Sequence, residues 1–159
     1  MSRYRAWAAL ALALAVAAPV PAWAGDNFGA SCRVAFSGLE LMYDPFATEP
    51  TTAVGTVDVE CTGVNGQIAV TIDATPGTSG SFAQRTMQTG RNPLFYNLYY
   101  NGSGTVFGDG TGGTAHYQRV LVAERGRATD SFSVQLVVPP RQDVGNGAYS
   151  DSLALDVEL

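Results

Sequence analysis

The chain has 159 residues, of which 46% are hydrophobic and 14% are charged, and its formal net charge is −5. All nine basic residues are arginine, and they form no cluster of the kind that binds nucleic acid or an anionic membrane surface. The length predicts a single domain.

Residues 1–24 have the features of a secretory signal peptide. Arg3 and Arg5 supply the positive end, Ala8 to Val16 form an apolar stretch, and Ala22-Trp23-Ala24 is a small-x-small cleavage site. A membrane anchor is the alternative, but the stretch is too short to span a bilayer and prolines close it. Cleavage removes 24 of the 159 residues and leaves an exported domain of 135, residues 25–159, whose net charge is −7 because two arginines are lost with the leader.

The exported part contains two cysteines, Cys32 and Cys61. A single pair in an exported chain predicts one disulfide. Two free thiols and a metal site are the alternatives, but two cysteines and the distant His116 do not form a ligand set.

Alternating apolar residues predict strands and no helix of useful length after the leader. Strands are expected at 53–61, 67–73, 94–100, 118–124, 131–138 and 153–159, with shorter ones at 32–36 and 39–42. Residues 62–66 form a turn, so the strands 53–61 and 67–73 are predicted to pair as a hairpin. In the strand 118–124, Val120 and Val122 face the same way. About seven main strands separated by turn-rich loops predict a two-sheet antiparallel sandwich.

The last predicted strand places Leu153, Leu155, Val157 and Leu159 on one face, and no polar tail follows it. Such a strand either packs fully inside its own sheet or leaves the sheet to be completed by another chain. The pattern alone leaves both possibilities open.

Residues with catalytic potential are few. The only histidine, His116, is expected in an exposed loop, without the Gly-x-Ser-x-Gly elbow of a serine hydrolase. Asp58 and Glu60 alternate with valines and are expected on the wet face of a strand. The segment 108–113 is glycine-rich but lacks the lysine of a phosphate loop and the acidic ligands of a calcium loop, so a tight turn is predicted. Asn101-Gly102-Ser103 fits either a glycosylation acceptor or an ordinary Asn-Gly turn. The sequence therefore predicts no enzyme, no cofactor and no metal site.

Several short motifs occur in an order that resembles the spore coat protein U domain family. They are Cys32, Tyr43-Asp44-Pro45, Gly55-Thr56-Val57, Cys61, Arg85-Thr86-Met87, Leu94-Phe95-Tyr96-Asn97-Leu98-Tyr99, Phe107-Gly108-Asp109-Gly110 and Gly147-Ala148-Tyr149-Ser150-Asp151. Within them, the family residues are Tyr96, Asn97, Gly108, Asp109, Gly110, Tyr149 and Asp151. Phe107 stands where a tryptophan is expected. The family includes subunits of archaic, Csu-type chaperone–usher pili.

This resemblance implies an incomplete immunoglobulin-like sandwich that lacks its final strand. A periplasmic pilus chaperone lends a strand first, and a neighbouring pilin subunit's N-terminal extension replaces it during assembly at an outer-membrane usher. The edge of the acceptor groove is then expected at Leu153, Leu155, Val157 and Leu159. The resemblance also implies export through the periplasm to the cell surface, with no direct membrane span and no nucleic-acid partner.

The segment before Cys32 is poorly suited to act as a donor strand. A donor strand needs about 10 residues with apolar side chains at alternate positions. Residues 25–31 number seven and carry one large apolar side chain, Phe28. We therefore expect a pilus subunit that accepts a strand but gives none, as at the tip or another end of a fibre.

Two other functions fit the sequence less well. One is a stand-alone secreted coat or carbohydrate-binding protein, in which Tyr96, Tyr99, Tyr100 and Phe107 could stack on sugars. The other is a hydrolase that uses His116.

Overall fold

The computed structural model describes residues 15–16, 27 and 29–159, and these contain nine strands and no helix. The rest of the expected signal peptide, and Gly25, Asp26 and Phe28 of the short N-terminal segment, lie outside the described residues. The strands are β1 (Ala15–Val16), β2 (Ser31–Ser37), β3 (Thr51–Thr62), β4 (Gln67–Ala74), β5 (Arg85–Thr89), β6 (Asn92–Tyr100), β7 (Tyr117–Val122), β8 (Arg127–Val138) and β9 (Ala154–Glu158).

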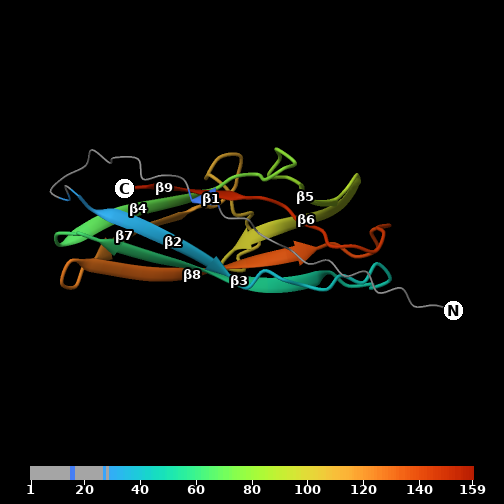
Figure 1. Ribbon diagram of the computed structural model, residues 1–159, viewed down its shortest axis with the longest axis horizontal. Coiled ribbons are helices and arrows are strands. Elements are labelled where there is room, and N and C mark those ends of the chain that lie inside the picture. Colours follow the sequence, from blue (N-terminus) through green and yellow to red (C-terminus); the bar gives the residue numbers. More distant parts are fainter. Residues whose placement is uncertain (1–14, 17–26, 28) are drawn as a thin grey trace.

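The strands form two sheets that pack face to face (Figure 1). One sheet has the order β1-β9-β4-β7, and the other has the order β2-β3-β8-β6-β5. All pairs are antiparallel except the two-residue pairing of β1 with β9. The predicted all-β sandwich is confirmed, and its arrangement is that of an incomplete immunoglobulin-like domain.

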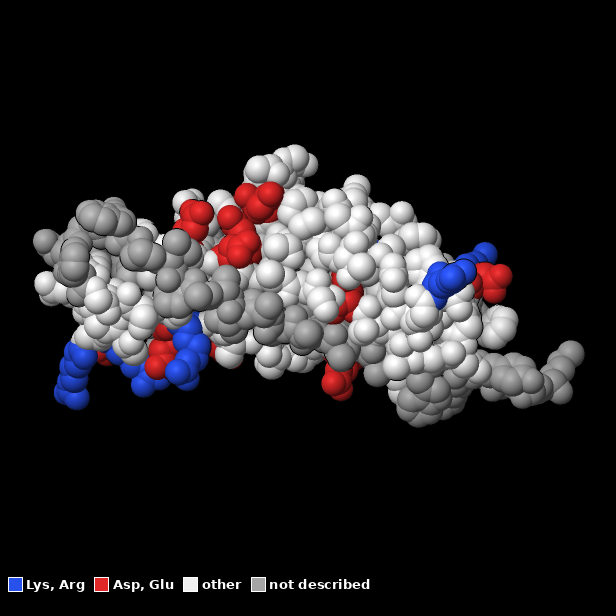
Figure 2. All heavy atoms as spheres, turned by 45° about the horizontal axis from the view of Figure 1, so that its top comes forward, with Lys and Arg blue, Asp and Glu red and all other residues white. Residues whose placement is uncertain are grey.

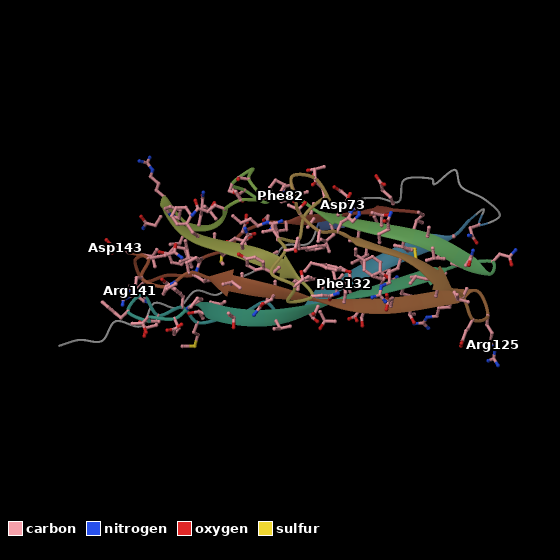
Figure 3. The ribbon with its side chains drawn as sticks, turned by 180° about the vertical axis from the view of Figure 1, so that it is seen from behind. Asp73, Phe82, Arg125, Phe132, Arg141 and Asp143 are labelled. Atoms are coloured by element: carbon pink, nitrogen blue, oxygen red, sulfur yellow. A yellow bond between two sulfur atoms is a disulfide. The ribbon has the colours of Figure 1, made fainter. Side chains whose placement is uncertain are left out.

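The core lies between the sheets and is built from the alternating inward residues of each strand. The predicted inward face of the strand 131–138 is confirmed, because Phe132, Val134, Leu136 and Val138 are all buried. Phe132 lies near the middle of the sandwich (Figure 3). Its ring centroid is 4.7 Å from that of Tyr117 and 5.5 Å from that of Phe107. Each such buried side chain contributes about 1.5–3 kcal/mol of hydrophobic stabilisation.

The predicted hairpin of residues 53–61 and 67–73 is wrong, although both strands exist. β3 pairs with β2 and β8, whereas β4 pairs with β7 and β9. The turn 62–66 therefore carries the chain from one sheet to the other. Within it Val64 is buried, and its backbone N–H donates to the carbonyl of Gly126 at 3.2 Å. Two alternating strands joined by a tight turn fit either a hairpin within one sheet or a connection between two sheets. The strand pattern therefore could not distinguish these two arrangements.

The expected short strand at residues 39–42 is also absent from the described structure. β2 ends at Ser37, and the next residue, Gly38, has a φ of +91°, a conformation that other residues rarely adopt. Leu39 is buried against Gly55, where an added Cβ would lie 2.8 Å from the Leu39 Cγ. The alternation in this stretch reflects anchoring of a loop to the core, not strand pairing.

Two further strands differ from the prediction. β7 covers most of the expected strand 118–124, and Val120 and Val122 share a face, but that face is turned to solvent. The inward residues of β7 are Tyr117 and Leu121. β5, a partner of β6, was not predicted as a strand, because Arg85 takes an inward position where an apolar residue is expected.

Cys32 and Cys61 form the predicted disulfide. They are directly opposite each other in the β2–β3 register, with their Cα atoms 4.0 Å apart. The bond therefore fastens β2, which lies at one edge of its sheet, to the long strand β3.

Charged side chains are scattered over the surface. On the face shown in Figure 2, charged residues occur in a few small groups, some of which contain both signs, and most of the surface is uncharged. Arg125 lies at one end of the sandwich, and Arg141 and Asp143 lie at the other (Figure 3). Asp58, as expected, is exposed on the outer face of β3, and Glu60 is partly exposed there and pairs with Arg127 at 2.7 Å.

Candidate functional site

The candidate site is the outer edge of β9. On one side β9 pairs with β4, from Thr71 opposite Glu158 to Ala74 opposite Leu155. On the other side, the only described neighbour is β1, which runs parallel with Ala15 opposite Ala154. β1 belongs to the expected signal peptide. The structure thus has a short apolar strand added in parallel to an edge that cleavage of the leader would expose.

The two faces of the β9 segment differ sharply in polarity. Leu153 and Leu155 point inward and are buried, whereas Asp156 is exposed on the outer face. Toward the end of the chain, Val157 and Leu159 are only partly buried against the core. The apolar face of the edge is therefore incompletely covered where the strand ends, as an acceptor of an alternating apolar strand requires.

A buried polar network lies beside the start of β9, and we define it as Arg85, Tyr96, Asn97 and Asp151. The Arg85 side chain is fully buried. Its guanidinium donates to the Asn97 Oδ1 at 2.8 Å, to the Phe107 carbonyl at 2.7 Å and to the Thr75 carbonyl at 3.0 Å. These bonds fasten β5 and β6 to the loops that follow β4 and β6, and they compensate the removal of a charge from water.

Asp151 occupies the other half of the network and is also buried. Its Oδ2 accepts a hydrogen bond of 2.5 Å from the Tyr96 hydroxyl. Its Oδ1 accepts from the Thr78 backbone N–H at 2.9 Å, the Thr78 hydroxyl at 2.6 Å and the Ser152 N–H at 2.8 Å. Gly77 lies so close that a Cβ there would be 2.9 Å or less from two side-chain atoms, one of Asp151 and one of Leu153. The carboxylate is therefore held by donors from β6 and from the loop after β4.

The network reaches β9 through one further pair of contacts. Ala154, the first residue of β9, donates its N–H to the Thr75 hydroxyl and accepts from the Thr75 N–H, both at 3.0 Å. Thr75 also supplies a carbonyl to Arg85. The start of the candidate edge is consequently fixed in position, while its far end at Leu159 lacks such contacts among the described residues.

Burial determines the protonation of this network. Burial raises the pKa of Tyr96, and the hydrogen bond to Asp151 raises it further. Burial lowers the pKa of Arg85, while the negative charge of Asp151 acts in the opposite direction. The raised pKa keeps Tyr96 neutral, and the charge of Asp151 offsets part of the cost of burying the Arg85 cation.

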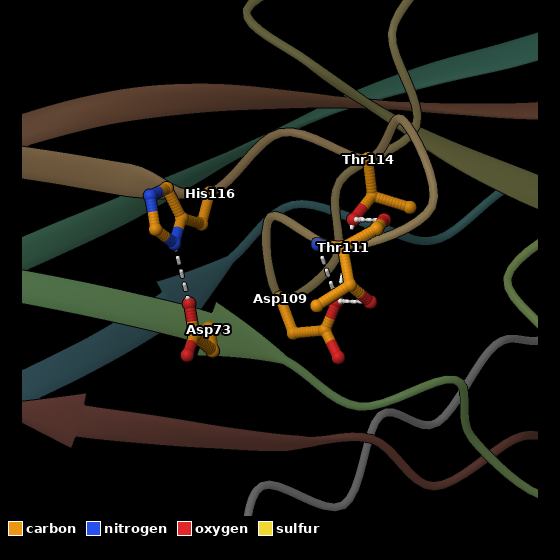
Figure 4. Close-up of polar contacts among 5 residues, drawn as sticks. All are labelled: Asp73, Asp109, Thr111, Thr114 and His116. Atoms are coloured by element: carbon orange, nitrogen blue, oxygen red, sulfur yellow. Dashed lines mark hydrogen bonds and ion pairs between the residues drawn. The ribbon is translucent and has the colours of Figure 1, made fainter.

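The glycine-rich segment 108–113 forms a tight turn, as predicted (Figure 4). The Asp109 Oδ1 accepts from the Thr111 hydroxyl at 2.6 Å and from the Thr111 N–H at 2.9 Å. These bonds lower the pKa of Asp109. The carboxylate is occupied in closing its own turn, a role that Asp residues commonly have in loops.

His116 is less exposed than expected. Its Nδ1 lies 2.9 Å from the Asp73 Oδ1, and 31% of the side chain is accessible (Figure 4). A Cβ at Gly110 would lie 3.1 Å from the same imidazole ring, so the turn packs closely on it. The described residues contain no group of three or more His, Cys, Asp or Glu side chains that could hold a metal ion.

Most of the aromatic side chains considered for sugar binding belong to the core. Tyr96 and Phe107 are buried, and Tyr100 stacks on Phe107 with centroids 5.9 Å apart. Tyr99 is half-buried. The Asn101-Gly102-Ser103 stretch is a turn, and the Asn101 Oδ1 accepts from the Ser133 N–H at 3.0 Å.

The structure gathers the family-motif residues from distant parts of the chain. Tyr96, Asn97 and Asp151 belong to the polar network, and the Phe107 carbonyl that precedes Gly108 is bound by Arg85. Asp109 and Gly110 lie in the adjoining turn. Tyr149 is buried two residues before Asp151, and its hydroxyl donates to the Gly145 carbonyl at 2.9 Å. The sequence marks Arg85 only as part of the Arg85-Thr86-Met87 motif, because nothing in these three residues alone indicates a buried guanidinium.

Together, the two sheets form an incomplete immunoglobulin-like sandwich in which β9 lies near one edge. The model of the Spore Coat Protein U domain matches residues 15–156. The chain therefore belongs to the Spore Coat Protein U domain family, and the resemblance seen in its motifs is confirmed.

The fold is similar to that of a solved structure at low sequence identity. It is the crystal structure of the CsuC–CsuE chaperone–tip adhesion subunit pre-assembly complex from the archaic chaperone-usher Csu pili of Acinetobacter baumannii. The match has 18% identity and a TM-score of 0.52, and it covers 83% of this chain but only 40% of the chain it matches. No curated protein sequence matches. Within the described residues, no helix is long and apolar enough to cross a membrane.

Proposed function

We propose that this protein is an exported structural subunit of an archaic chaperone–usher pilus and that its β9 edge is completed by a strand from another chain. The observation that carries the proposal is the parallel pairing of Ala15–Val16 with β9. After cleavage of the leader, this edge has unpaired backbone groups and partly covered apolar side chains. Both features favour addition of an extended apolar segment.

The comparisons support the same proposal. The family match covers nearly the whole exported domain, and the related fold occurs in a complex of a pilus chaperone with a tip adhesion subunit. We accordingly propose a periplasmic chaperone as the first partner, then an outer-membrane usher and neighbouring pilin subunits at the cell surface. The role is structural, not enzymatic.

Co-expression with a periplasmic pilus chaperone tests this proposal. We expect a stable one-to-one complex and aggregation of the chain when the chaperone is omitted. A Val157→Asp variant places a charge on the partly covered apolar face and should abolish the complex. Glu158→Gln changes an exposed, outward-facing neighbour and serves as the matched control. A chain that is soluble and highly stable alone, with no affinity for any chaperone, would contradict the proposal.

We further propose that the subunit occupies a terminal position, such as the tip. The support is the composition of residues 25–31, which offer one large apolar side chain to an acceptor groove. The purified exported chain should not polymerise with itself. Polymers joined through residues 25–31, as shown by cross-linking of that segment to β9, would refute the terminal position while leaving the strand-accepting edge intact.

A further inference from the structure

A shallow depression lies at the end of the sandwich that carries Arg141 and Asp143 (Figure 3). It is formed by the loop after β2 and the loop after β8, and its volume is about 420 Å³. Phe46, Arg141, Asp143 and Asn146 contribute to its lining. Loops at the end of a rigid sandwich are a common place for binding sites.

Phe46 is a large aromatic residue with 78% of its surface exposed, and hydrogen bonds hold the backbone turn that carries it. The Asp44 side chain accepts from the Phe46 N–H at 2.9 Å, and the Asp44 carbonyl accepts from the Ala47 N–H at 3.1 Å. Tyr43, just before this turn, is buried, and its hydroxyl accepts from the Gln142 N–H at 2.8 Å. The ring is therefore presented to solvent by a braced turn, so little backbone conformational entropy is lost when a ligand packs on it.

The opposite wall is braced in the same way. The Gln142 amide accepts from the Phe95 N–H at 2.7 Å and donates to the Phe95 carbonyl at 2.8 Å. On either side of Gln142, Arg141 and Asp143 are exposed. Neither side chain makes a hydrogen bond or ion pair with any described residue, and they do not pair with each other. The loop thus holds a cation and a carboxylate apart, beside an aromatic ring.

This combination suits one class of ligand. A sugar ring has an apolar C–H face that packs on an aromatic ring, and hydroxyls around its rim that need both donors and acceptors. Phe46 provides the first, while Arg141, Asp143 and Asn146 provide the second. The volume is in the range of small-molecule sites. We propose that the depression binds the terminal sugar of a glycan, with the ring stacked on Phe46 and its hydroxyls bonded to Asp143 and Asn146.

This proposal does not depend on a pilus function, and it differs from the sugar site expected from the sequence. Of the four aromatic residues that the sequence offers for that role, Tyr96 and Phe107 are part of the core, Tyr100 packs against it, and Tyr99 is half-buried. Phe46 lies in a different loop, the one that follows β2, after the buried residues Leu39 and Tyr43. Arg141 would determine whether a carboxylate-bearing sugar is preferred over a neutral one.

Saturation-transfer NMR on the exported chain, with whichever partner co-purifies with it, tests the proposal. The probes are methyl β-galactoside and glucuronic acid, and the partner alone is the blank. Phe46→Ala should weaken binding roughly tenfold or more, which corresponds to about 1.4 kcal/mol. Met42→Ala is the matched control, because Met42 is 51% exposed in the same loop but does not line the depression. Its effect should stay within about twofold, less than 0.5 kcal/mol.

The outcomes separate the alternatives. Loss of only the acidic probe in Arg141→Ala supports the proposal and assigns the carboxylate contact to that residue. Loss of binding of both probes in Arg141→Ala also supports the proposal and indicates that Arg141 donates to a sugar hydroxyl. Absence of transfer to either sugar, or equal losses in the Phe46 and Met42 variants, would overturn the proposal. The second result would indicate a general apolar contact surface instead.

Discussion

The close packing of Gly77 on Asp151 gives a sharp test of the polar network beside β9. We compare Gly77→Ala with Gly80→Ala, two substitutions in the same loop. Both glycines have positive φ, +76° and +68°, so both variants bear a similar backbone cost. They differ in their surroundings, since a Cβ at Gly80 meets nothing within 4 Å.

The expected magnitudes follow from that difference. The left-handed conformation costs an alanine about 1–2 kcal/mol, and this is the whole effect expected for Gly80→Ala. A Cβ at Gly77 would overlap the Asp151 Oδ2, the atom that accepts from the Tyr96 hydroxyl. Displacing the carboxylate removes a hydrogen bond to a charged group, which contributes about 1.5–3 kcal/mol. Gly77→Ala should therefore lower the free energy of unfolding by about 2 kcal/mol or more beyond the loss in Gly80→Ala.

Urea unfolding of the disulfide-intact exported chain, monitored by far-ultraviolet circular dichroism, measures the loss of stability in each variant. Equal losses of stability in the two variants would refute the reasoning, because they would show that Asp151 can move aside at no cost. A Gly77 variant that is less stable but retains the Tyr96–Asp151 bond in its structure would refute it as well.

Three further predictions concern the same fold. Tyr96→Phe removes a buried hydrogen bond to Asp151 and should lower the free energy of unfolding by about 2 kcal/mol. Tyr117→Phe should lower it by about 1 kcal/mol or less, because its partner Asp130 is partly exposed and has Arg119 nearby. A larger loss in Tyr117→Phe than in Tyr96→Phe would contradict this ranking. Replacing both Cys32 and Cys61 with alanine should cost about 3.5 kcal/mol for a loop of this length, and reduction of the native chain should reproduce most of that loss in the same urea titration. Burial raises the pKa of Tyr96 and Tyr117 above the usual 10.0, so the folded state holds these protons more tightly. Their contribution to stability is complete below pH 10 and should be lost as the pH rises above it, with tyrosinate absorbance appearing together with unfolding; tyrosinate that forms well before unfolding would contradict it.

Period-2 alternation identified most strands because this sandwich buries one face of each. Phe132, Val134 and Leu136 in β8 illustrate the case in which pattern and burial agree. The same signal does not carry strand order. β3 and β4 are adjacent in sequence and yet belong to different sheets, and only the buried Val64 in the turn between them marks the corner.

The polar network was hidden for a related reason. Arg85, Asn97 and Asp151 are residue types that usually lie at the surface, and their burial depends on partners that are up to 73 residues away in the chain. The order and spacing of the family motifs identified these residues in the sequence. Only the structure shows that they lie together in one hydrogen-bonded network. Phe46 is the opposite case. Phenylalanine is usually buried, but Phe46 is exposed, and nothing in the sequence around it indicates this.

The strand-accepting edge of β9 is the central claim, and amide hydrogen exchange of Ala154–Glu158 tests it most directly. In the exported chain without a partner, kept dilute enough to stay in solution, the β9 amides that bond neither to β4 nor to Thr75 should exchange rapidly. Binding of a chaperone or of a donor peptide should then protect them, while the amides of β3 and β8 change little. If β9 is already as well protected as β3 in the lone chain, or if a bound partner leaves its exchange unchanged, the edge is not the site at which another chain is added.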